Sequence, residues 1–196
     1  CSPSFAAGAR LPPGFPVLTR ASALAIFSTL TQRPPVSQAP SSAPATSSVP
    51  AISCDVAIIG GGPAGLMVAE VLAQSGVAAH LFDAMPSVGR KFLLAGKGGL
   101  NLTHSEPHEP FASRYAARQP LIEPLIRAFG SPEVRAWAQG LGVETFVGTS
   151  GRVFPTDMKA APLLRAWLHR LREAGVRFHM RHRWLGWNDA GAMCFD

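Results

Sequence analysis

Three glycines and one carboxylate have the types and spacing to bind a dinucleotide. Gly60, Gly62 and Gly65 follow the pattern G-x-G-x-x-G. In that pattern the first glycine permits a tight turn, the second leaves room for a pyrophosphate beside the backbone, and the third lets a helix pack closely on a strand. Asp83 follows 18 residues after Gly65, close to the spacing of about 20 at which an acid accepts hydrogen bonds from ribose hydroxyls. Together these residues predict a dinucleotide site.

The flanking sequence supplies the elements that such a site needs. Residues 54–60, CDVAIIG, form a short apolar run that is typical of a parallel strand buried on both faces. A helical pattern follows in residues 66–76, and residues 77–83 predict a second buried strand that ends in the acid. The start of this helix offers unpaired N–H groups and about half a positive charge to a phosphate. A glycine turn of purely structural use would leave the strand, the helix and the acid unexplained.

A second glycine-rich segment follows soon after the acid. Residues 89–106, GRKFLLAGKGGLNLTHSE, contain four glycines, three basic residues and Asn101. We predict a loop here, in which Arg90 and Lys91 neutralise phosphate charge and backbone amides face a flavin ring. The alternative is an irregular surface loop. NAD and FAD share the first glycine pattern, so the choice between them depends on this downstream segment.

Three blocks of the chain are distinctive when taken together: DVAIIGGGPAGLMVAEVLAQSG, FDAMPSVGRKFLLAGKGGLNLTHSE and GRVFPTDMKAAPLLRAW. They resemble the successive blocks of the BaiN-like bacterial flavoproteins, a family also described as aminoacetone-oxidase-type FAD-binding enzymes, and the similarity spans residues 54–196. The resemblance implies an FAD-dependent oxidoreductase with a Rossmann-type FAD domain and an inserted substrate domain. Much of that family has Arg-Cys before the asparagine, where this chain has Gly99 and Leu100. This departure suggests a distinct branch, so the family's substrate is not carried over.

The resemblance also assigns cofactor contacts residue by residue. It implies that the glycine turn meets the pyrophosphate, that Asp83 binds the adenosine ribose, that Arg90 and Lys91 lie on the adenosine or phosphate side, and that Asn101 lies near the flavin. The full set of predicted cofactor-binding residues is Gly60, Gly62, Pro63, Ala64, Gly65, Asp83, Arg90, Lys91, Gly96, Gly98 and Asn101. The catalytic residues stay unassigned, because the flavin itself would carry the hydride or the electrons.

The remaining sequence predicts helices and hairpins. Ser131 is predicted to cap a helix in residues 131–142, with Pro132 and Glu133 in its first turn. A second helix from Lys159 to Gly175 is amphipathic, and its apolar residues are Leu163, Leu164, Trp167, Leu168 and Leu171. The other predicted elements are a helix in residues 119–130, a hairpin in 143–155 that turns at 149–151, a core strand in 176–180 and a hairpin around 188–191.

Several residues in this part allow a functional and a structural interpretation. Arg152 and Phe154 lie either near the flavin or substrate, as the resemblance implies, or serve as a surface arginine and a core phenylalanine. A run of arginines with Trp184 and Trp187 could stack on RNA, but a solvated basic helix face followed by a core strand is the favoured interpretation. The histidines lack metal-site spacing and are predicted to contact solvent or to pack, namely His169, His179 and His182.

Composition divides the chain into two parts. Residues 1–53 contain three arginines, no acidic residue and half of the 18 prolines, which predicts a disordered leader. This leader is either an upstream extension or a transit peptide for organelle import. Residues 54–196 have nearly balanced charge, which weakens the case for nucleic acid. No apolar run reaches the roughly 18 residues of a membrane span, and three cysteines form no closed disulfide framework, so we expect a cytoplasmic protein without a bound metal.

The sequence therefore predicts an α/β protein with a three-layer Rossmann-type FAD/NAD(P)-binding fold around a parallel sheet. A sheet of order 3-2-1-4-5 would have only its first strands here, so we expect an incomplete domain, an N-terminal part of a larger enzyme that is inactive by itself. The expected function is FAD-dependent oxidation or reduction of a small-molecule substrate, with NAD(P)H as a candidate electron donor. The alternatives are an NAD(P)-binding oxidoreductase and a nucleotide- or RNA-interacting module without redox turnover.

Overall fold

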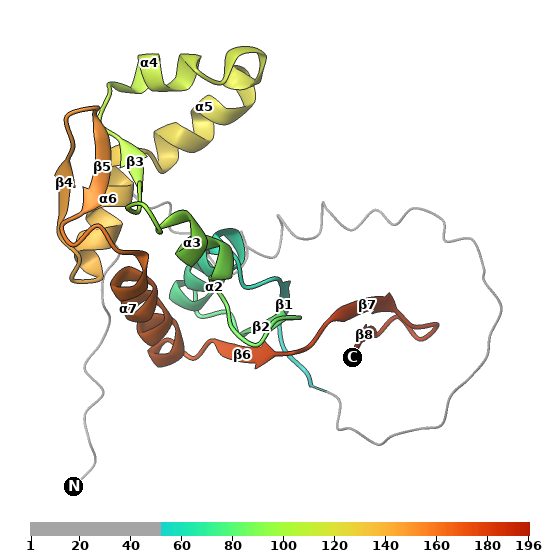
Figure 1. Cartoon of the computed structure of the whole chain (residues 1–196). Coiled ribbons are helices and arrows are strands. Elements are labelled where there is room, and N and C mark those ends of the chain that lie inside the picture. The colour runs from blue at the N-terminus through green and yellow to red at the C-terminus, as the bar shows by residue number, and fades with distance from the viewer. Residues whose placement is uncertain (1–51) are drawn as a thin grey trace, which may run out of the picture. The chain divides into compact units, whose positions relative to one another are not determined.

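The computed structural model describes residues 52–196, so nearly all of the predicted leader lies outside the described residues. The described residues divide into two compact units. The first, here called the sheet unit, comprises residues 52–88 and Ala174–Asp196, and the second, the helical unit, comprises Gly89–Glu173. Each unit is described by itself. Figure 1 labels their helices and strands.

The sheet unit is built on three parallel strands. Strand β1 (Val56–Ile59) pairs with β2 (Ala79–Asp83), which in turn pairs with β6 (Arg177–Met180), in the order β1-β2-β6. Helix α2 (Pro63–Gln74) connects β1 to β2, and the antiparallel hairpin of β7 (Trp184–Trp187) and β8 (Met193–Phe195) follows β6. The strands, the helix and the final hairpin that the sequence predicted are all present, and the parallel Rossmann-type sheet is confirmed.

Apolar residues at helical spacing hold α2 on this sheet. Leu66, Ala69 and Leu72 are buried, and Leu66 is 0% exposed, as is Leu81 at the centre of β2. Full burial of a leucine stabilises a fold by about 1.5–3 kcal/mol. Ile59, in contrast, is 43% exposed, although the sequence predicted a strand buried on both faces. Within the described residues β1 is the edge strand of this sheet, with β2 as its partner on one side.

The helical unit combines a small antiparallel sheet with several helices. Its strands have the order β3-β5-β4, and the turn of the predicted hairpin lies between β4 and β5. Its elements in chain order are α3 (Arg90–Ala95), β3 (Thr103–His104), α4 (His108–Ser113), the 3₁₀ turn η1 (Ala116–Arg118), α5 (Gln119–Ala128), α6 (Ser131–Gly140), β4 (Thr145–Val147), β5 (Arg152–Pro155) and α7 (Ala160–Glu173).

Trp167 of α7 is central to the core of the helical unit. Its ring meets Trp137 of α6 edge-on at 4.8 Å between centroids and lies 6.3 Å from Phe92 of α3. Trp167 is 2% exposed, and aromatic pairs of this geometry stabilise beyond the area that they bury. The predicted apolar side of α7 is buried, except that Leu168 is only half-buried.

Two sequence predictions for this unit need correction. Residues 89–106 are not a continuous loop, because Arg90–Ala95 form α3 after Gly89, whose φ of +69° starts the turn into the helix. The N-cap of α6 is Gly130 rather than Ser131, and the Glu133 carboxylate accepts a hydrogen bond from the Gly130 N–H at 2.9 Å. A Cβ at residue 130 would lie 2.6 Å from the Ile126 carbonyl oxygen, so a serine does not fit the cap position.

Among the described helices, none combines the length and the hydrophobicity that crossing a membrane requires.

Candidate dinucleotide-binding site

The turn between β1 and α2 has the backbone that the glycine pattern predicted. Gly60 adopts a φ of +103°, a conformation that residues with a Cβ rarely take. Its N–H donates to the Phe82 carbonyl at 2.8 Å, which continues the β1–β2 ladder into the turn. A Cβ on Gly65 would clash with the Gly60 carbonyl oxygen. The first and third glycines therefore let the chain leave the strand and return as a helix pressed against it.

Gly61 is a structural residue that sequence reasoning missed. It is buried, and a Cβ there would clash with the Val88 side chain. Its N–H donates to Asp83 Oδ2 at 2.6 Å, which joins the glycine turn to the end of β2. The signal was present in the run of three glycines at residues 60–62, but its two partners are identified only by the fold.

Gly62 and the start of α2 form the open part of the turn. A Cβ on Gly62 would meet no atom within 4 Å, and Pro63 and Ala64 are exposed. The first intrahelical bond runs from the Leu66 N–H to the Gly62 carbonyl, so the amides of Ala64 and Gly65 precede it and point out of the helix end. With no acidic residue in the first turn, this end can hold an anion such as a pyrophosphate.

Asp83 at the end of β2 is already held by two backbone amides. Its Oδ2 accepts from Gly61 and its Oδ1 accepts from Met85 at 2.7 Å. A carboxylate has about four acceptor positions, so these two bonds leave capacity for ribose hydroxyls. The predicted acid thus lies beside the glycine turn with its orientation fixed.

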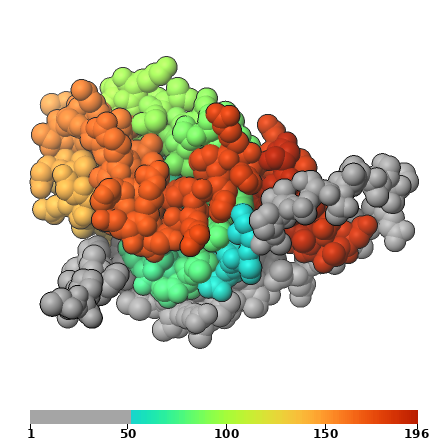
Figure 2. Space-filling view, turned by 90° about the horizontal axis from the view of Figure 1, so that it is seen from below, coloured from blue at the N-terminus to red at the C-terminus, as the bar shows by residue number. Residues whose placement is uncertain are grey.

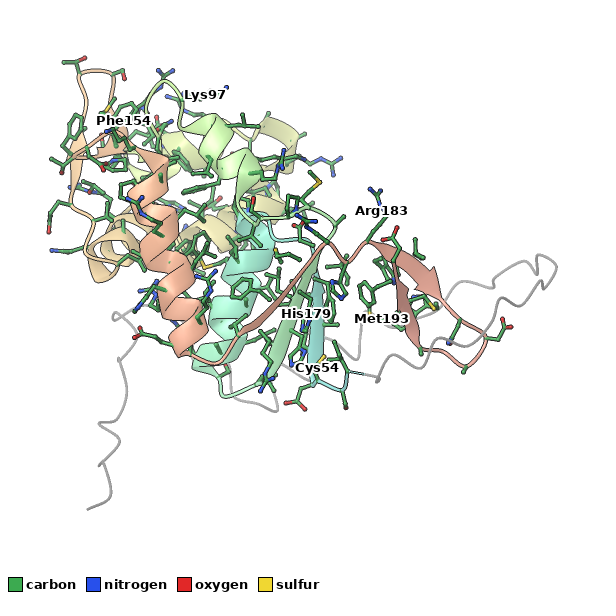
Figure 3. The ribbon with its side chains drawn as sticks, turned by 60° about the horizontal axis from the view of Figure 1, so that its bottom comes forward. Cys54, Lys97, Phe154, His179, Arg183 and Met193 are labelled. Carbon is green, nitrogen blue, oxygen red and sulfur yellow. The ribbon has the colours of Figure 1, made fainter. Side chains whose placement is uncertain are left out.

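The helical unit contains the remaining predicted residues. Arg90 and Lys91 occupy the exposed first turn of α3. Gly98 and Asn101 are exposed, and a Cβ on Gly98 would meet no atom within 4 Å; Lys97 beside them is labelled in Figure 3. Gly96 has a packing role, since a Cβ there would lie 2.5 Å from that of Ala160. The contact of these residues with the ligand of the glycine turn stays a prediction.

Phe154 packs against the second glycine segment (Figure 3). Its ring is 5.9 Å from that of Phe146 across the hairpin, and it is 3.8 Å from the position that a Cβ on Gly99 would take. Arg152 is exposed. The geometry assigns Phe154 a packing role, while a contact of either residue with flavin or substrate stays a prediction.

The histidines and Cys54 have identifiable surroundings. His169 pairs with Glu173 at 3.1 Å on the exposed side of α7, whereas His179 hydrogen-bonds His80 and His182 Nδ1 lies 2.9 Å from the Met180 carbonyl. Among the residues that the structure describes, no three His, Cys, Asp or Glu side chains are grouped to hold a metal.

Burial, reinforced by the Asp55 carboxylate, raises the pKa of the Cys54 thiol, which makes it a poor nucleophile.

Comparison with known proteins identifies the family. The protein family described as "HI0933-like protein Rossmann domain" matches residues 54–195 of this chain. The chain belongs to the HI0933-like Rossmann domain family. The match covers all three sequence blocks, so the predicted resemblance is confirmed, as is the Rossmann-type fold with its strand, glycine turn and helix.

Several solved structures are similar to this chain at low sequence identity. The 3-ketosteroid-Δ4-(5α)-dehydrogenase of Rhodococcus jostii RHA1, in complex with 4-androstene-3,17-dione, is 16% identical with a TM-score of 0.51, covering 72% of this chain and 43% of its own. THI4 of Thermovibrio ammonificans is 18% identical with a TM-score of 0.42, covering 72% and 45%. The glycine oxidase of Bacillus cereus ATCC 14579 is 19% identical with a TM-score of 0.37, covering 69% and 48%. The HI0933-like chain thus spans less than half the length of each.

Proposed function

We propose that this chain contributes the FAD-binding part of an FAD-dependent oxidoreductase, with residues 54–196 belonging to the FAD-binding domain. The observation that carries the proposal is the geometry of the sheet unit. An open helix N-terminus and an oriented carboxylate lie side by side, joined by the hydrogen bond from Gly61 to Asp83. This pair of groups matches the pyrophosphate and the ribose of a dinucleotide.

The proposed cofactor contacts follow the sequence assignment. The N–H groups of Gly62, Ala64 and Gly65 bind the pyrophosphate, Gly60 and Pro63 shape the turn beside it, and Asp83 accepts hydrogen bonds from the adenosine ribose. Arg90 and Lys91 supply positive charge on the adenosine or phosphate side. Gly96, Gly98 and Asn101 of the second glycine segment belong to the flavin end. The resemblance of that segment to the flavoprotein block favours FAD over NAD(P) as the resident dinucleotide.

The chemistry would be that of the flavin, which accepts or donates a hydride or single electrons when bound. The chain's own residues hold the pyrophosphate, orient the ribose and balance the phosphate charge. We propose a small-molecule substrate, with NAD(P)H as a candidate electron donor, and the cytoplasm as the compartment. Gly99 and Leu100, which replace the Arg-Cys common in the resembled family, argue against transferring a substrate from that family.

Cofactor binding is the direct test of this proposal. The purified chain is expected to bind FAD, giving flavin absorbance after gel filtration and a higher melting temperature. FAD at 100 times its dissociation constant stabilises the fold by about 2.7 kcal/mol. Stabilisation by NADPH but not by FAD would instead support the NAD(P)-binding alternative. A colourless protein that neither dinucleotide stabilises would contradict dinucleotide binding.

Asp83→Asn is predicted to weaken FAD binding about tenfold, because a charge-assisted hydrogen bond to ribose contributes about 1.5 kcal/mol or more. The measurement is FAD titration by quenching of flavin fluorescence. Asn is preferable to Ala, because its single oxygen can still accept from the buried Gly61 N–H while its NH2 group faces only the exposed Met85 N–H, which water can solvate. Ala would leave the Gly61 N–H without an acceptor.

Asp55→Asn is the matched control for this change. Its carboxylate also accepts a backbone N–H, from Ala78 at 3.1 Å, but it lies at the opposite end of β1 from the glycine turn. The Asp55→Asn protein should bind FAD with the same affinity as the unaltered chain. Equal affinities for all three proteins would remove Asp83 from the proposed site.

A further inference from the structure

A stack of five aromatic rings joins the sheet to the final hairpin within the sheet unit. His179, labelled in Figure 3, lies between His80 and Phe82, with centroid distances of 5.0 and 4.5 Å. Phe82 then stacks on Phe195 of β8 at 4.4 Å, and His182 meets Phe82 at 6.1 Å. His80 and Phe82 are two positions apart on β2 and therefore lie on the same face of the sheet, whereas Leu81 lies on the opposite face.

The stack is closed by a hydrogen bond between two imidazoles. His179 Nε2 lies 3.1 Å from His80 Nδ1. One of these nitrogens must carry the proton and the other must accept it. The pair can therefore be neutral or can hold a single extra proton, but two imidazolium rings would present two N–H groups to each other. Full protonation is incompatible with this contact.

The groups around the pair include three arginines and two carboxylates. Arg177 pairs with His80 in the β2–β6 register, and Arg181 and His182 follow β6. On the other elements, the Cys54 thiol and Asp55 lie at the start of β1, and Arg183 and Asp196 of the hairpin face each other at 3.8 Å. Burial and Arg177 lower the pKa of His80, and burial, His80, His182 and Arg177 lower the pKa of His179.

The same segment is bonded to the proposed ribose site. The His182 N–H donates to the Asp83 carbonyl at 3.0 Å, and the Arg181 N–H donates to the Met85 carbonyl at 3.2 Å. A cavity of about 840 Å³ borders Phe82, His182 and Phe195. Figure 2 shows the first described residues, in cyan, and the segment around β6, in orange-red, on the same face of the molecule. Water that reaches the cavity can solvate the rings once the stack separates.

We propose that the His80–His179 pair is an acid-sensitive latch for the β7–β8 hairpin. With both imidazoles neutral, the ring stack keeps Phe195 on Phe82 and the hairpin on the sheet. Protonation of both breaks the nitrogen contact, separates the stack and releases the hairpin. Because the segment leading to the hairpin is bonded to Asp83 and Met85, release also loosens the ribose site; this second effect rests on the proposed function.

The direction of the pH dependence follows from proton binding. The folded chain disfavours protonated His80 and His179, whereas the unfolded chain binds these protons near the ordinary histidine pKa of about 6.5. The unfolded or opened state therefore binds more protons as the pH falls below about 6.5. The stabilising effect of the latch is complete above that pH and is lost progressively toward the lowered pKa values of the folded chain.

Hydrogen exchange of residues 184–196 in the full chain tests the latch. After correction for intrinsic rates, exchange should be at least tenfold faster at pH 5 than at pH 7.5. His179→Phe keeps a ring in the stack and removes one of the two imidazoles, so a protonated His80 no longer faces a second N–H group and the hairpin should be equally protected at both pH values. His169→Phe, an exposed histidine of the helical unit, should behave like the unaltered chain. Equal protection of the unaltered chain at both pH values, or an acid response retained in His179→Phe, would overturn the latch.

Two further measurements keep the test decisive if His179→Phe folds poorly. In the unaltered chain, the ring protons of His80 and His179 should titrate below the ordinary histidine range as the nuclear Overhauser contact between Phe82 and Phe195 disappears. A contact that persists after both rings are protonated would overturn the latch. Phe195→Ala should leave the hairpin exposed to exchange at pH 7.5, and full protection there would also count against it.

The effect on the cofactor is measured separately with FAD-loaded protein. Flavin should dissociate faster at pH 5 than at pH 7.5 in the unaltered chain, but at equal rates in His179→Phe. Hairpin opening with unchanged flavin dissociation would overturn the coupling to the ribose site. Absence of FAD binding at every pH would overturn the proposed function, whereas the hydrogen-exchange result would still decide the latch.

Discussion

Gly65→Ala is expected to lower the free energy of unfolding by about 3 kcal/mol or more. The new methyl group would clash with the Gly60 carbonyl oxygen, which belongs to the backbone and cannot rotate away. Relief requires α2 to move off β1, and that movement would open the packing of the fully buried Leu66 on the sheet. Overpacking costs typically 1–3 kcal/mol when side chains can adjust, so a clash with backbone should lie at or beyond the upper end.

Urea denaturation followed by circular dichroism measures this effect. Gly62→Ala is the matched control, because it lies in the same turn at a φ of −78° with no atom near its Cβ position. Its stability should fall by only about 0.5–1 kcal/mol, the cost of alanine at a helix N-cap. Similar unfolding midpoints for the two variants would contradict the close approach of helix and strand.

The same Gly62→Ala change is expected to weaken FAD binding about a hundredfold. The open space at Gly62 is where the pyrophosphate is proposed to meet the backbone, and a methyl group there pushes the phosphates away from the amides of Ala64 and Gly65. Losing hydrogen bonds to charged groups at about 1.5 kcal/mol each, for two bonds, corresponds to two orders of magnitude in affinity.

Isothermal titration with FAD, at a temperature where all variants are folded, measures this loss. Val68→Ala is a suitable control, since Val68 is exposed in the middle of α2, away from its N-terminus. Its affinity should match that of the unaltered chain. If Gly62→Ala bound FAD as tightly as the control, the pyrophosphate would have to lie elsewhere.

The two changes separate the roles that the pattern G-x-G-x-x-G assigns to its second and third glycines. In the structure Gly65 is required for folding, whereas Gly62 leaves space that the folded chain itself does not use. Stability and cofactor affinity should therefore respond to different glycines.

Local signals predicted most of the fold because they depend on neighbouring residues. Apolar runs and glycine stops located β1, α2, β2 and α7, and the turn residues located both hairpins. The signals failed where local preferences compete. Glycine spacing in residues 89–106 suggested a loop, yet α3 forms from five good helix formers and one phenylalanine. Ser131 is the commoner type of cap, but the crowded Ile126 carbonyl selects Gly130.

The tertiary partners of the site could not be predicted in the same way. Asp83 was identified by its spacing, but its bond to Gly61 depends on how the turn closes over the end of β2. His80 and His179 are 99 positions apart and meet only through the register of two parallel strands. The hydrophobic pattern of either segment alone does not predict this register, because the register is set by side-chain packing across the whole sheet.

The hydrogen bond from Gly61 to Asp83 has a consequence for how a ligand would arrive. It fixes the phosphate turn and the ribose acid relative to each other before any dinucleotide binds. A preformed pair of contacts loses little conformational entropy on association, so more of the interaction energy appears as affinity. Recognition at this half of the cofactor should then resemble docking onto a rigid surface, with an association rate limited by encounter rather than by rearrangement of the turn.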